Sequence, residues 1–330
     1  MKKVSPAPIP IRPRRIRRTP ALRRLFSETS VGPSHCIAPL FVQDGAKSTS
    51  IPSLPGHFRF SISDLQREAS RLLRRGVGGI ALFPCVGPHL RCPTGKAAFD
   101  PKGLIPRSLR ILKRELPDFP VFADVALDPY TSHGHDGVLN PSGREVDNDK
   151  TIPLLIQQAL VLAEAGADFV APSDMMDGRI GAIRRALDLS GFTSTGILSY
   201  AAKFASSLYG PFRDAVGSAQ SAGTSSLDKR GYQADPANRR AILRDALLDE
   251  AEGADILMVK PAGPYLDILR DLRESTHLPL AAYQVSGEYA QIHAAAQKGW
   301  TDLRKTRDES LLSIRRSGAD IIFTYFAKDI

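Results

Sequence analysis

Two lysines stand at the ends of short apolar runs in this chain of 330 residues. Lys260 closes the run 256–260 and precedes a proline, and Lys203 closes the run 197–203. An ammonium group at the end of a buried strand loses hydration, which favours the neutral amine. Because a neutral amine attacks carbonyl carbons to form Schiff bases, the pair predicts imine chemistry. A single lysine of this kind would more often be salt-bridged or reach solvent.

Carboxylates gather in the segment 124–136. Asp124 and Asp128 are four residues apart, so on a strand their side chains would share one face, and Asp136 follows in the same segment. Beside a lysine, such acids can transfer protons, hold a substrate amine or bind a hard cation. His133 and His135 add candidate acid–base or ligand groups, although an Asp- and His-rich loop is often only a hydrogen-bonded network.

A repeating unit along the chain must position these groups. A polar, periodic segment ends in glycine and leads into a short apolar run, most clearly at 75–83, 165–171, 252–259 and 317–323, the last three of which contain Gly-Ala-Asp. Glycine suits the C-terminus of a helix, and a continuous apolar run suits a strand buried on both faces. Eight strands are expected, at 37–42, 79–84, 121–127, 169–172, 196–202, 256–261, 280–285 and 321–327, which predicts an α/β fold of the (β/α)8 TIM barrel type. An open doubly wound sheet is the alternative, but the G-x-G-x-x-G turn that would favour it is missing.

Helical periodicity separates several of these strands. It predicts helices at 62–75, 236–252, 265–274, 287–298 and 308–317. Two long segments, 129–150 and 204–235, are expected to be loops after the third and fifth strands. Barrel enzymes keep their sites at the C-terminal ends of the strands, so both loops are expected to carry function, the second as a lid.

The net charge of +9 comes from the N-terminus rather than from the body of the chain. Residues 1–25 hold nine Lys or Arg residues and no acid, and in the rest of the chain basic and acidic residues are equal in number. Five prolines there favour extended or polyproline II backbone. The sequence thus predicts a basic, proline-rich N-terminal arm, 1–35, and a barrel domain, 36–330. The arm could bind RNA, wrap a neighbouring subunit or stay solvated; the neutral body favours assembly and argues against nucleic acid as a partner.

Signals for secretion or membrane insertion are not visible. No run approaches 18 apolar residues, and no apolar stretch follows the basic N-terminus, so no membrane contact is expected. The cysteines Cys36, Cys85 and Cys92 fit neither a disulfide framework nor a zinc ribbon, and we expect buried or incidental thiols in a reducing compartment. These features predict a cytoplasmic protein.

A set of motifs spread over nearly the whole chain resembles the porphobilinogen synthase (5-aminolaevulinate dehydratase) family. The motifs occupy residues 14–18, 37–42, 124–137, 171–179, 199–205, 209–215, 258–261, 282–288 and 325–327. The resemblance implies a hydro-lyase that joins two 5-aminolaevulinate molecules into one pyrrole with loss of two waters, a step of tetrapyrrole and haem synthesis. It also implies a (β/α)8 barrel with an arm that embraces neighbouring subunits, usually in a homo-octamer.

The same resemblance assigns roles residue by residue. Lys260 matches the lysine that forms a Schiff base with the substrate on the propionate side of the product, and Lys203 matches the lysine for the acetate-side substrate. Ser286 and Tyr325 match residues that hold the carboxylate of the first substrate. Arg213 and Lys229, both in the expected lid, match cations that hold the carboxylate of the second, which suits the two-donor grip of arginine.

Two departures from the family pattern concern metals. Many members place three cysteines where this chain has Ala126, Asp128 and Asp136, so we expect no catalytic zinc and an aspartate-type site. Many members also bind an activating magnesium through a glutamate fifteen residues before the Schiff-base lysine, a position held here by Asp245. Mg²⁺ could still bind through water. No organic cofactor is expected.

Two other classes of function compete with this one. A Schiff-base aldolase on the same barrel would need only one essential lysine and would ignore 5-aminolaevulinate. A non-catalytic assembly or RNA-binding protein would use residues 1–24, show salt-dependent RNA affinity and tolerate loss of Lys260.

Overall fold

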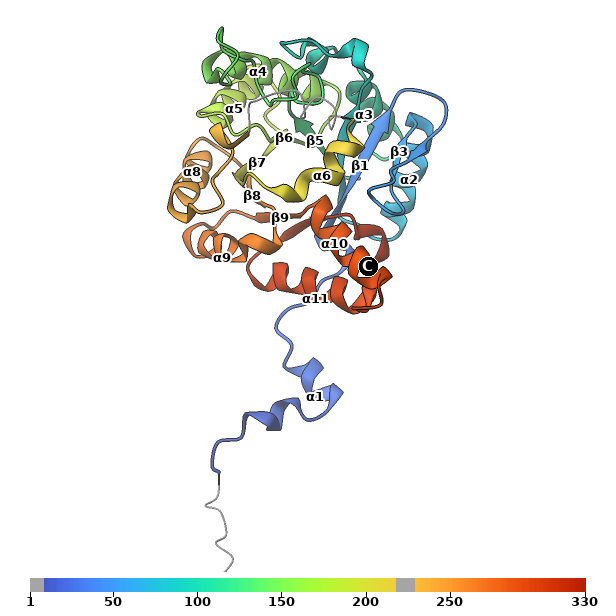
Figure 1. Cartoon of the computed structure of the whole chain (residues 1–330), viewed down its shortest axis with the longest axis vertical. Helices are drawn as coiled ribbons and strands as arrows, with labels where there is room; N and C mark the ends of the chain where they lie inside the picture. Colours follow the sequence, from blue (N-terminus) through green and yellow to red (C-terminus); the bar gives the residue numbers. More distant parts are fainter. Residues whose placement is uncertain (1–8, 218–228) are drawn as a thin grey trace, which may run out of the picture.

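Eight parallel strands close into a barrel in the computed structural model, which describes residues 9–217 and 229–330 (Figure 1). The hydrogen-bonded order runs β10-β9-β8-β7-β6-β5-β4-β1, and β10 pairs with β1 to complete the ring. The strands are β1 (Cys36–Gln43), β4 (Gly79–Cys85), β5 (Val121–Val125), β6 (Phe169–Pro172), β7 (Gly196–Lys203), β8 (Ile256–Lys260), β9 (Leu280–Gln284) and β10 (Ile321–Thr324). The predicted (β/α)8 fold is therefore confirmed.

Helices surround the barrel (Figure 1). They are α2 (Ile62–Arg74), α3 (Leu104–Glu115), α4 (Asn148–Glu164), α5 (Arg179–Leu189), α8 (Arg239–Ala251), α9 (Leu266–Ser275), α10 (Ser286–Gln297) and α11 (Leu303–Arg316). Side-chain caps explain where two of them begin. Helix α8 begins three residues later than predicted because the Asn238 side chain accepts the N–H of Ala241. Helix α11 begins five residues earlier because Asp302 caps it in the same way.

A short hairpin after β1 was not predicted. It consists of β2 (Thr49–Ser50) and β3 (Phe58–Phe60), and β3 pairs in parallel with the end of β1 at Phe41 and Val42. Strand β1 pairs with β10 only at Cys36 and Ile37, so the hairpin covers an edge that β10 leaves open. The expected loop 204–235 also contains a helix, α6 (Gly210–Ala215), while its residues 218–228 lie outside the described part.

The Gly-Ala-Asp repeats have a structural role that explains their recurrence. Asp168, Asp255 and Asp320 each stand directly before a strand. Their carboxylates accept the backbone N–H of Val121, Ile197 and Leu280, at 2.7, 2.7 and 3.0 Å, near the start of the preceding strand. Each aspartate also donates its own N–H to the carbonyl of the same residue. We call these reciprocal contacts the aspartate staples; they join β5 to β6, β7 to β8 and β9 to β10.

The described part of the arm is helical where extended backbone was expected. Residues Pro13–Arg17 form a 3-10 helix and Pro20–Leu25 form α1, capped by the Thr19 hydroxyl. The prediction is wrong because each helix begins at a proline, where the missing N–H needs no partner and the fixed φ suits the first turn. In Figure 1 the arm stands away from the barrel, and several of its apolar side chains are exposed: Ile9, Ile11, Ile16, Leu25 and Phe26. Residues 1–8 of the predicted arm lie outside the described residues.

Membrane insertion finds no support in the helices. Over 9–217 and 229–330, no helix has both the length and the apolar character needed to cross a bilayer.

The staples predict a specific loss of stability. Asp255→Ala leaves the Ile197 N–H without its acceptor, and an unpaired buried donor costs about 1–3 kcal/mol of unfolding free energy. Asp255→Asn keeps a side-chain carbonyl at the same place and should lose much less. Chemical denaturation of the two variants measures the difference, and equal stability would contradict the role of the staple.

Candidate active site

The two lysines end neighbouring strands of the barrel. Lys203 is the last residue of β7, Lys260 is the last residue of β8, and the two are partners in the strand register. A register shift in β7 between Ser199 and Ala202 precedes this pairing. Both side chains are 6% exposed. The barrel thus brings two buried amines to one place at the C-terminal ends of its strands, as the sequence predicted.

Lys260 lies in an aromatic enclosure. Its Nζ atom is 4.9 Å from the ring centre of Tyr200, 5.3 Å from Tyr209, 5.2 Å from Phe212 and 4.6 Å from Tyr283. Burial, followed by the charge of Lys203, lowers the pKa of Lys260 to about 7. Carboxylates nearby oppose this shift only in part. A large share of Lys260 is therefore the neutral, nucleophilic amine near neutral pH.

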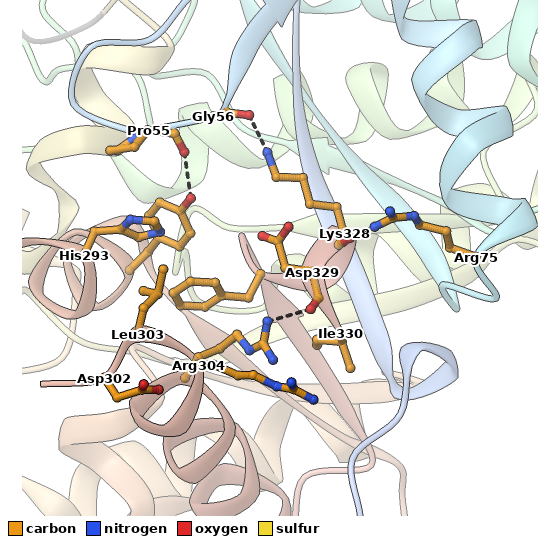
Figure 2. Close-up of a pocket in the computed structure, with 13 residues that line it drawn as sticks. Pro55, Gly56, Arg75, His293, Asp302, Leu303, Arg304, Lys328, Asp329 and Ile330 are labelled. Atoms are coloured by element: carbon orange, nitrogen blue, oxygen red, sulfur yellow. Dashed lines mark hydrogen bonds between the residues drawn. The ribbon is translucent and has the colours of Figure 1, made fainter. Parts of the chain in front are cut away.

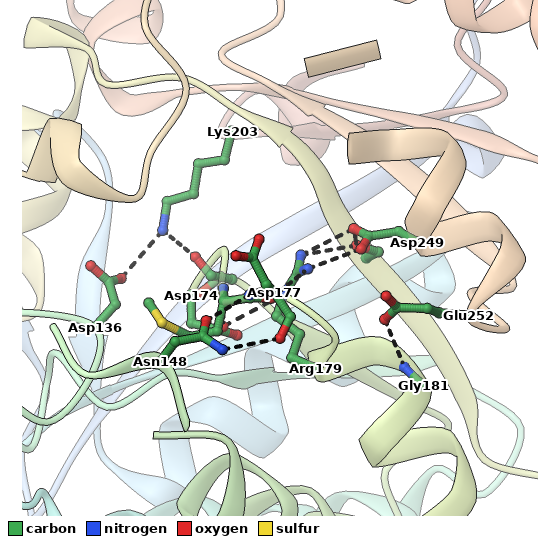
Figure 3. Close-up of polar contacts among 12 residues, drawn as sticks. Asp136, Asn148, Asp174, Asp177, Arg179, Gly181, Lys203, Asp249 and Glu252 are labelled. Atoms are coloured by element: carbon green, nitrogen blue, oxygen red, sulfur yellow. Dashed lines mark hydrogen bonds and ion pairs between the residues drawn. The ribbon is translucent and has the colours of Figure 1, made fainter. Parts of the chain in front are cut away.

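Lys203 has polar partners instead of rings. Its ammonium group donates to Asp136 Oδ1 at 3.3 Å and to the carbonyl of Ser173 (Figure 3). The Oδ2 atom of Asp136 also lies 2.7 Å from Lys229 Nζ and accepts a hydrogen bond from the Tyr232 hydroxyl at 2.7 Å. Burial alone would raise the pKa of Asp136, but the two ammonium groups outweigh it and hold the pKa well below the usual range. The two lysines are therefore chemically different: one is caged by rings, and the other is bound by a carboxylate.

The surroundings of Asp124 suit a group that transfers protons. Its Oδ1 atom is buried and has no hydrogen-bond partner. Burial and then the charge of Asp128 raise the pKa of Asp124 to about 7, against the opposing effect of both lysines. A carboxyl group with this pKa can both take up and release a proton near neutral pH.

Asp128 faces the site, but not for the reason that the alternation of side chains along a strand predicted. Strand β5 ends at Val125, short of the predicted 127, so Asp128 is not part of the strand. Tyr130 and Thr131 both donate their N–H groups to the Leu127 carbonyl, which turns the chain there. Asp128 nevertheless faces the site, because its Oδ2 atom is 3.3 Å from Lys229 Nζ.

The two histidines of this loop contact residues around the site. The Nδ1 atom of His135 lies 3.1 Å from the Tyr232 hydroxyl, and Nε2 of His133 lies 3.1 Å from the carbonyl of Pro93. Burial lowers the pKa of both imidazoles, which favours their neutral forms. Sequence reasoning missed Tyr232, Ser173 and Gln233, of which only Ser173 falls in a recognised motif, 171–179.

Ser286 and Tyr325 are buried close to the aromatic enclosure. Ser286 begins α10, and its hydroxyl accepts the N–H of Phe212 at 3.0 Å. The Tyr325 hydroxyl is 3.3 Å from that of Tyr283, whose ring borders Lys260. These two predicted residues therefore lie on the Lys260 side of the site.

Four basic side chains converge on one small cavity. Lys203, Lys260, Arg213 and Lys229 line it together with Asp128 and Gln233. Arg213 comes from α6 and Lys229 from the 3-10 helix Lys229–Gly231. Burial would lower the pKa of Lys229, but Asp128 and Asp136 raise it above its ordinary value, so the side chain is charged. This lining suits a small ligand with a carbonyl group and carboxylates.

Asp245 lies outside this cavity. It is exposed on α8 and borders a separate cavity of about 390 Å³ with Asp177, Asp249 and Glu252. Asp249 forms an ion pair with Arg179 at 3.0 Å, and the Glu252 carboxylate accepts the N–H of Gly181 (Figure 3). Among the described residues, Asp177 and Asp245 are the carboxylates of this cavity whose side chains have neither an ion pair nor a hydrogen bond. Within the described ranges, no three His, Cys, Asp or Glu side chains are grouped as a metal site.

A buried ion network separates the two cavities. Arg179 lies between Asp249 and Asp174, and Ser199 of β7 donates to Asp249. Burial raises the pKa of Asp174 to about 6, although the Arg179 charge opposes the shift. The network fixes the segment 173–179, which supplies the Ser173 carbonyl to Lys203.

The largest hollow of the three is not the candidate site. It has a volume of about 940 Å³ and lies near Lys328, Asp329 and Ile330 (Figure 2). Three of its cations are bound to main-chain carbonyls: Arg75 to that of Lys328, Lys328 to that of Gly56 and Arg307 to that of Asp329. The fourth, Arg304, pairs with the Asp308 carboxylate at 3.8 Å. None of the predicted catalytic residues lines it.

Comparisons with known proteins agree with this geometry. The family model described as Delta-aminolevulinic acid dehydratase matches residues 10–330. A chloroplastic delta-aminolevulinic acid dehydratase from Physcomitrium patens is 52% identical over 325 residues, which are 98% of this chain and 74% of the relative. The delta-aminolevulinic acid dehydratase of Bradyrhizobium diazoefficiens is 49% identical over 96% of this chain and 89% of its own. The Toxoplasma gondii enzyme, solved with the reaction product porphobilinogen, superposes with a TM-score of 0.95 at 49% identity, covering 98% of this chain and 91% of that one.

The relatives also correct one expectation. The relatives from Physcomitrium patens, Glycine max and Hordeum vulgare, at 52, 50 and 49% identity, are named chloroplastic. The prediction of a cytoplasmic protein is therefore wrong. It rested on missing signals and unpaired cysteines, and neither feature distinguishes the cytoplasm from a reducing organelle.

Proposed function

The chain belongs to the delta-aminolevulinic acid dehydratase family, and from this premise we propose how its residues perform the family's reaction. Its function is that of a lyase that joins two 5-aminolaevulinate molecules into porphobilinogen with loss of two waters. The observation that carries the residue assignment is the register pairing of Lys203 with Lys260, which sets two buried amines side by side. Two substrates fixed on such a pair react as if they were one molecule, which removes an entropic barrier.

Lys260 forms the first covalent bond in this proposal. Its neutral amine attacks the ketone of one substrate, and the carbinolamine loses water to give a Schiff base. Asp124 is the candidate for moving the protons, because its pKa of about 7 suits both directions of transfer. The rings around Lys260 keep water from hydrolysing the imine.

Lys203 holds the second substrate through its own Schiff base, which forms with loss of one water after the ammonium group has given up a proton. Asp124, which interacts with the charge of Lys203, is the candidate acceptor of that proton, and Asp136 and the Ser173 carbonyl orient the nitrogen for the attack. The carboxylate of the first substrate is assigned to Ser286 and Tyr325, and that of the second to Arg213 and Lys229. In the structure Lys229 pairs with Asp128 and Asp136, so binding of the second substrate exchanges one carboxylate partner for another.

The lysine roles predict distinct behaviour of two variants supplied with 5-aminolaevulinate. Lys260→Ala should form less than about a tenth of the normal pyrrole, because no first carbinolamine can form. Lys203→Ala should also lose turnover, yet borohydride should still trap one substrate on Lys260. In the unaltered protein, trapping on Lys260 should decline as the pH falls below about 7, since protonation removes the nucleophile. In Lys203→Ala this decline should begin at a higher pH, because the charge of Lys203 no longer lowers the pKa of Lys260. Pyrrole colorimetry and mass spectrometry measure both effects.

A matched control is Lys298→Ala, because Lys298 is an exposed lysine just after α10 and should be dispensable. Normal turnover of Lys260→Ala would contradict the assignment. Loss of all trapping in Lys203→Ala would contradict the two-lysine scheme. A protein that traps carbonyl compounds on one lysine and ignores 5-aminolaevulinate would instead favour the aldolase alternative.

The metal assignments follow from the donor atoms. Ala126 offers no ligand, and Asp128 and Asp136 already face the ammonium groups of Lys203 and Lys229, which would repel a dication. These residues do not fit a catalytic zinc, and the proposed reaction uses none. Burial and then the charge of Asp177 raise the pKa of Asp245. Asp245 and Asp177 both line the outer cavity, and their carboxylate oxygens fit hydrated Mg²⁺, which would relieve the repulsion between them. A bound Mg²⁺ would supply charge stabilisation on the outer face of the barrel.

Removal of metals tests both assignments. Chelator-treated protein should form pyrrole without added Zn²⁺, because the lysines and Asp124 need no metal ligand. Added Mg²⁺ should raise the rate in the unaltered protein and in the exposed control Asp118→Ala, but not in Asp245→Ala. A strict requirement for Zn²⁺ would refute the aspartate-type site, and equal Mg²⁺ stimulation of Asp245→Ala would refute the outer site.

The arm, residues 1–35, is proposed to hold a homo-oligomer together. Its apolar side chains Ile9, Ile11, Leu25 and Phe26 are more than half exposed in the single chain, a state that burial against a neighbouring subunit would relieve. An octamer is the assembly that the family resemblance implies.

Deletion of residues 1–24 should therefore reduce the mass of the assembly in solution. The contacts of Ile9, Ile11 and Ile16 would be lost, while the barrel, which begins at Cys36, keeps its strands. Light scattering measures the mass, and circular dichroism checks the fold. An unchanged mass would contradict the assembly role of the arm.

A further inference from the structure

Helix α6 brings two functional side chains to the candidate site. Phe212 forms one wall of the Lys260 enclosure, 5.2 Å from the ammonium nitrogen, and Arg213 borders the substrate cavity. The helix has only six residues, Gly210–Ala215, and its own hydrogen bonds cannot fix its position over the barrel. Contacts from other elements must therefore determine where Phe212 and Arg213 stand.

Arg59 of β3 binds the C-terminal end of α6. Its Nε atom donates to the carbonyl of Ala215 at 2.8 Å, and Nη2 donates to the carbonyl of Asp214 at 2.7 Å. The Nη2 atom is also 3.2 Å from the Asp214 carboxylate. The last carbonyls of a helix have no partner within it, and they carry the negative end of its dipole. The guanidinium group satisfies two of these carbonyls at once.

The rest of the hairpin and α10 complete the attachment. Ser53, between β2 and β3, donates its hydroxyl to Asp214 Oδ2 at 2.5 Å. Ser286 of α10 accepts the N–H of Phe212 at 3.0 Å. The helix is thus fixed on one side by the β2–β3 hairpin and on the other by a proposed substrate-binding residue.

We propose that Arg59 is a positioning residue of this enzyme, which holds α6 so that Arg213 meets the substrate carboxylate and Phe212 shields the Schiff-base lysine. The proposal rests on the function and the residue roles proposed above. Arg59 itself does not line the substrate cavity, so it acts through α6 and not on the reacting atoms.

The geometry requires arginine in particular. Arginine has a planar fork of donors that reaches two carbonyls at once, whereas lysine has a single donor atom. Arg59→Lys should therefore keep only part of the hold on α6. The ion pair with Asp214 is the weaker component, because the Asp214 side chain is 42% exposed and water screens the charge. The two main-chain carbonyls therefore account for most of the hold on α6.

The enclosure gives a readout that general destabilisation would not change. The charged groups around Lys260 are Lys203 from β7, Asp124 from β5, and Asp128 and Asp136 from the loop after β5. Arg213 of α6 and Lys229 of the 3-10 helix line the same cavity. The neighbouring tyrosines have raised pKa values and stay neutral. If Phe212 moves away, water reaches Lys260, and the pKa of the amine rises from about 7 toward its ordinary value of 10.5.

The test compares full-length variants with 5-aminolaevulinate as the substrate. Arg59→Met should raise KM by about tenfold with a smaller change in kcat, because carboxylate binding by Arg213 is lost in the ground and transition states alike. The pH midpoint for borohydride trapping on Lys260 should also move upward. Asp214→Asn should give a smaller rise in KM. Arg67→Met, at an arginine whose side chain is 78% exposed on α2, is the matched control and should behave like the unaltered protein.

Several results would overturn the proposal. A variant Arg59→Met with lowered thermal stability but an unchanged KM and trapping midpoint would show a purely structural contact. If that variant does not fold, Arg59→Lys decides, since an unchanged KM there would equally refute the role. Failure of the unaltered protein to form pyrrole would refute the proposed function instead, and the two failures are thus distinguishable.

Discussion

Two buried lysine side chains lie side by side, where two positive charges would repel each other, and this constraint determines what surrounds them. The barrel imposes this closeness, because Lys203 and Lys260 end adjacent strands in register. The two lysines have different surroundings. Lys203 forms an ion pair with the Asp136 carboxylate, whereas Lys260 is surrounded by four aromatic rings and has a lowered pKa. A symmetrical site would give two equivalent amines, but the product requires two substrates in different roles. The asymmetry of neighbours therefore provides the chemical distinction between the two lysines.

The carboxylates of Asp128 and Asp136 follow the same constraint. Asp128 and Asp136 face Lys203 and Lys229, so two negative charges meet two positive ones. This pairing keeps Lys229 charged beside the cavity. Asp124 stands apart from this pairing, and its oxygen without a partner is free to exchange protons. Charge compensation and acid–base chemistry are thus divided among three aspartates of one segment.

The sequence predicted those features whose signals are local. Buried parallel strands are continuous apolar runs, so all eight were found, and residues at strand ends had to converge. Strand ends at Val125 and Thr324 were overestimated, because the following residues are apolar for reasons of core packing. The grip of Arg59 on α6 joins residues 155 and 156 positions apart and leaves no periodic trace in the chain. Tyr232 was missed for the same reason. The helical turns of the arm were missed because proline was read only as a helix breaker.

The aspartate staples have a consequence for how the chain is made. Asp168 binds a residue 47 positions earlier, Asp255 one 58 positions earlier and Asp320 one 40 positions earlier. Each staple thus joins two consecutive strands, and nothing beyond the second strand is needed to form it. During synthesis, β5–β6 and β7–β8 can each close as a unit while later segments are still on the ribosome. The β9–β10 staple and the pairing of β10 with β1 must wait for the last strand. The barrel can therefore grow by strand pairs, with ring closure as the final event.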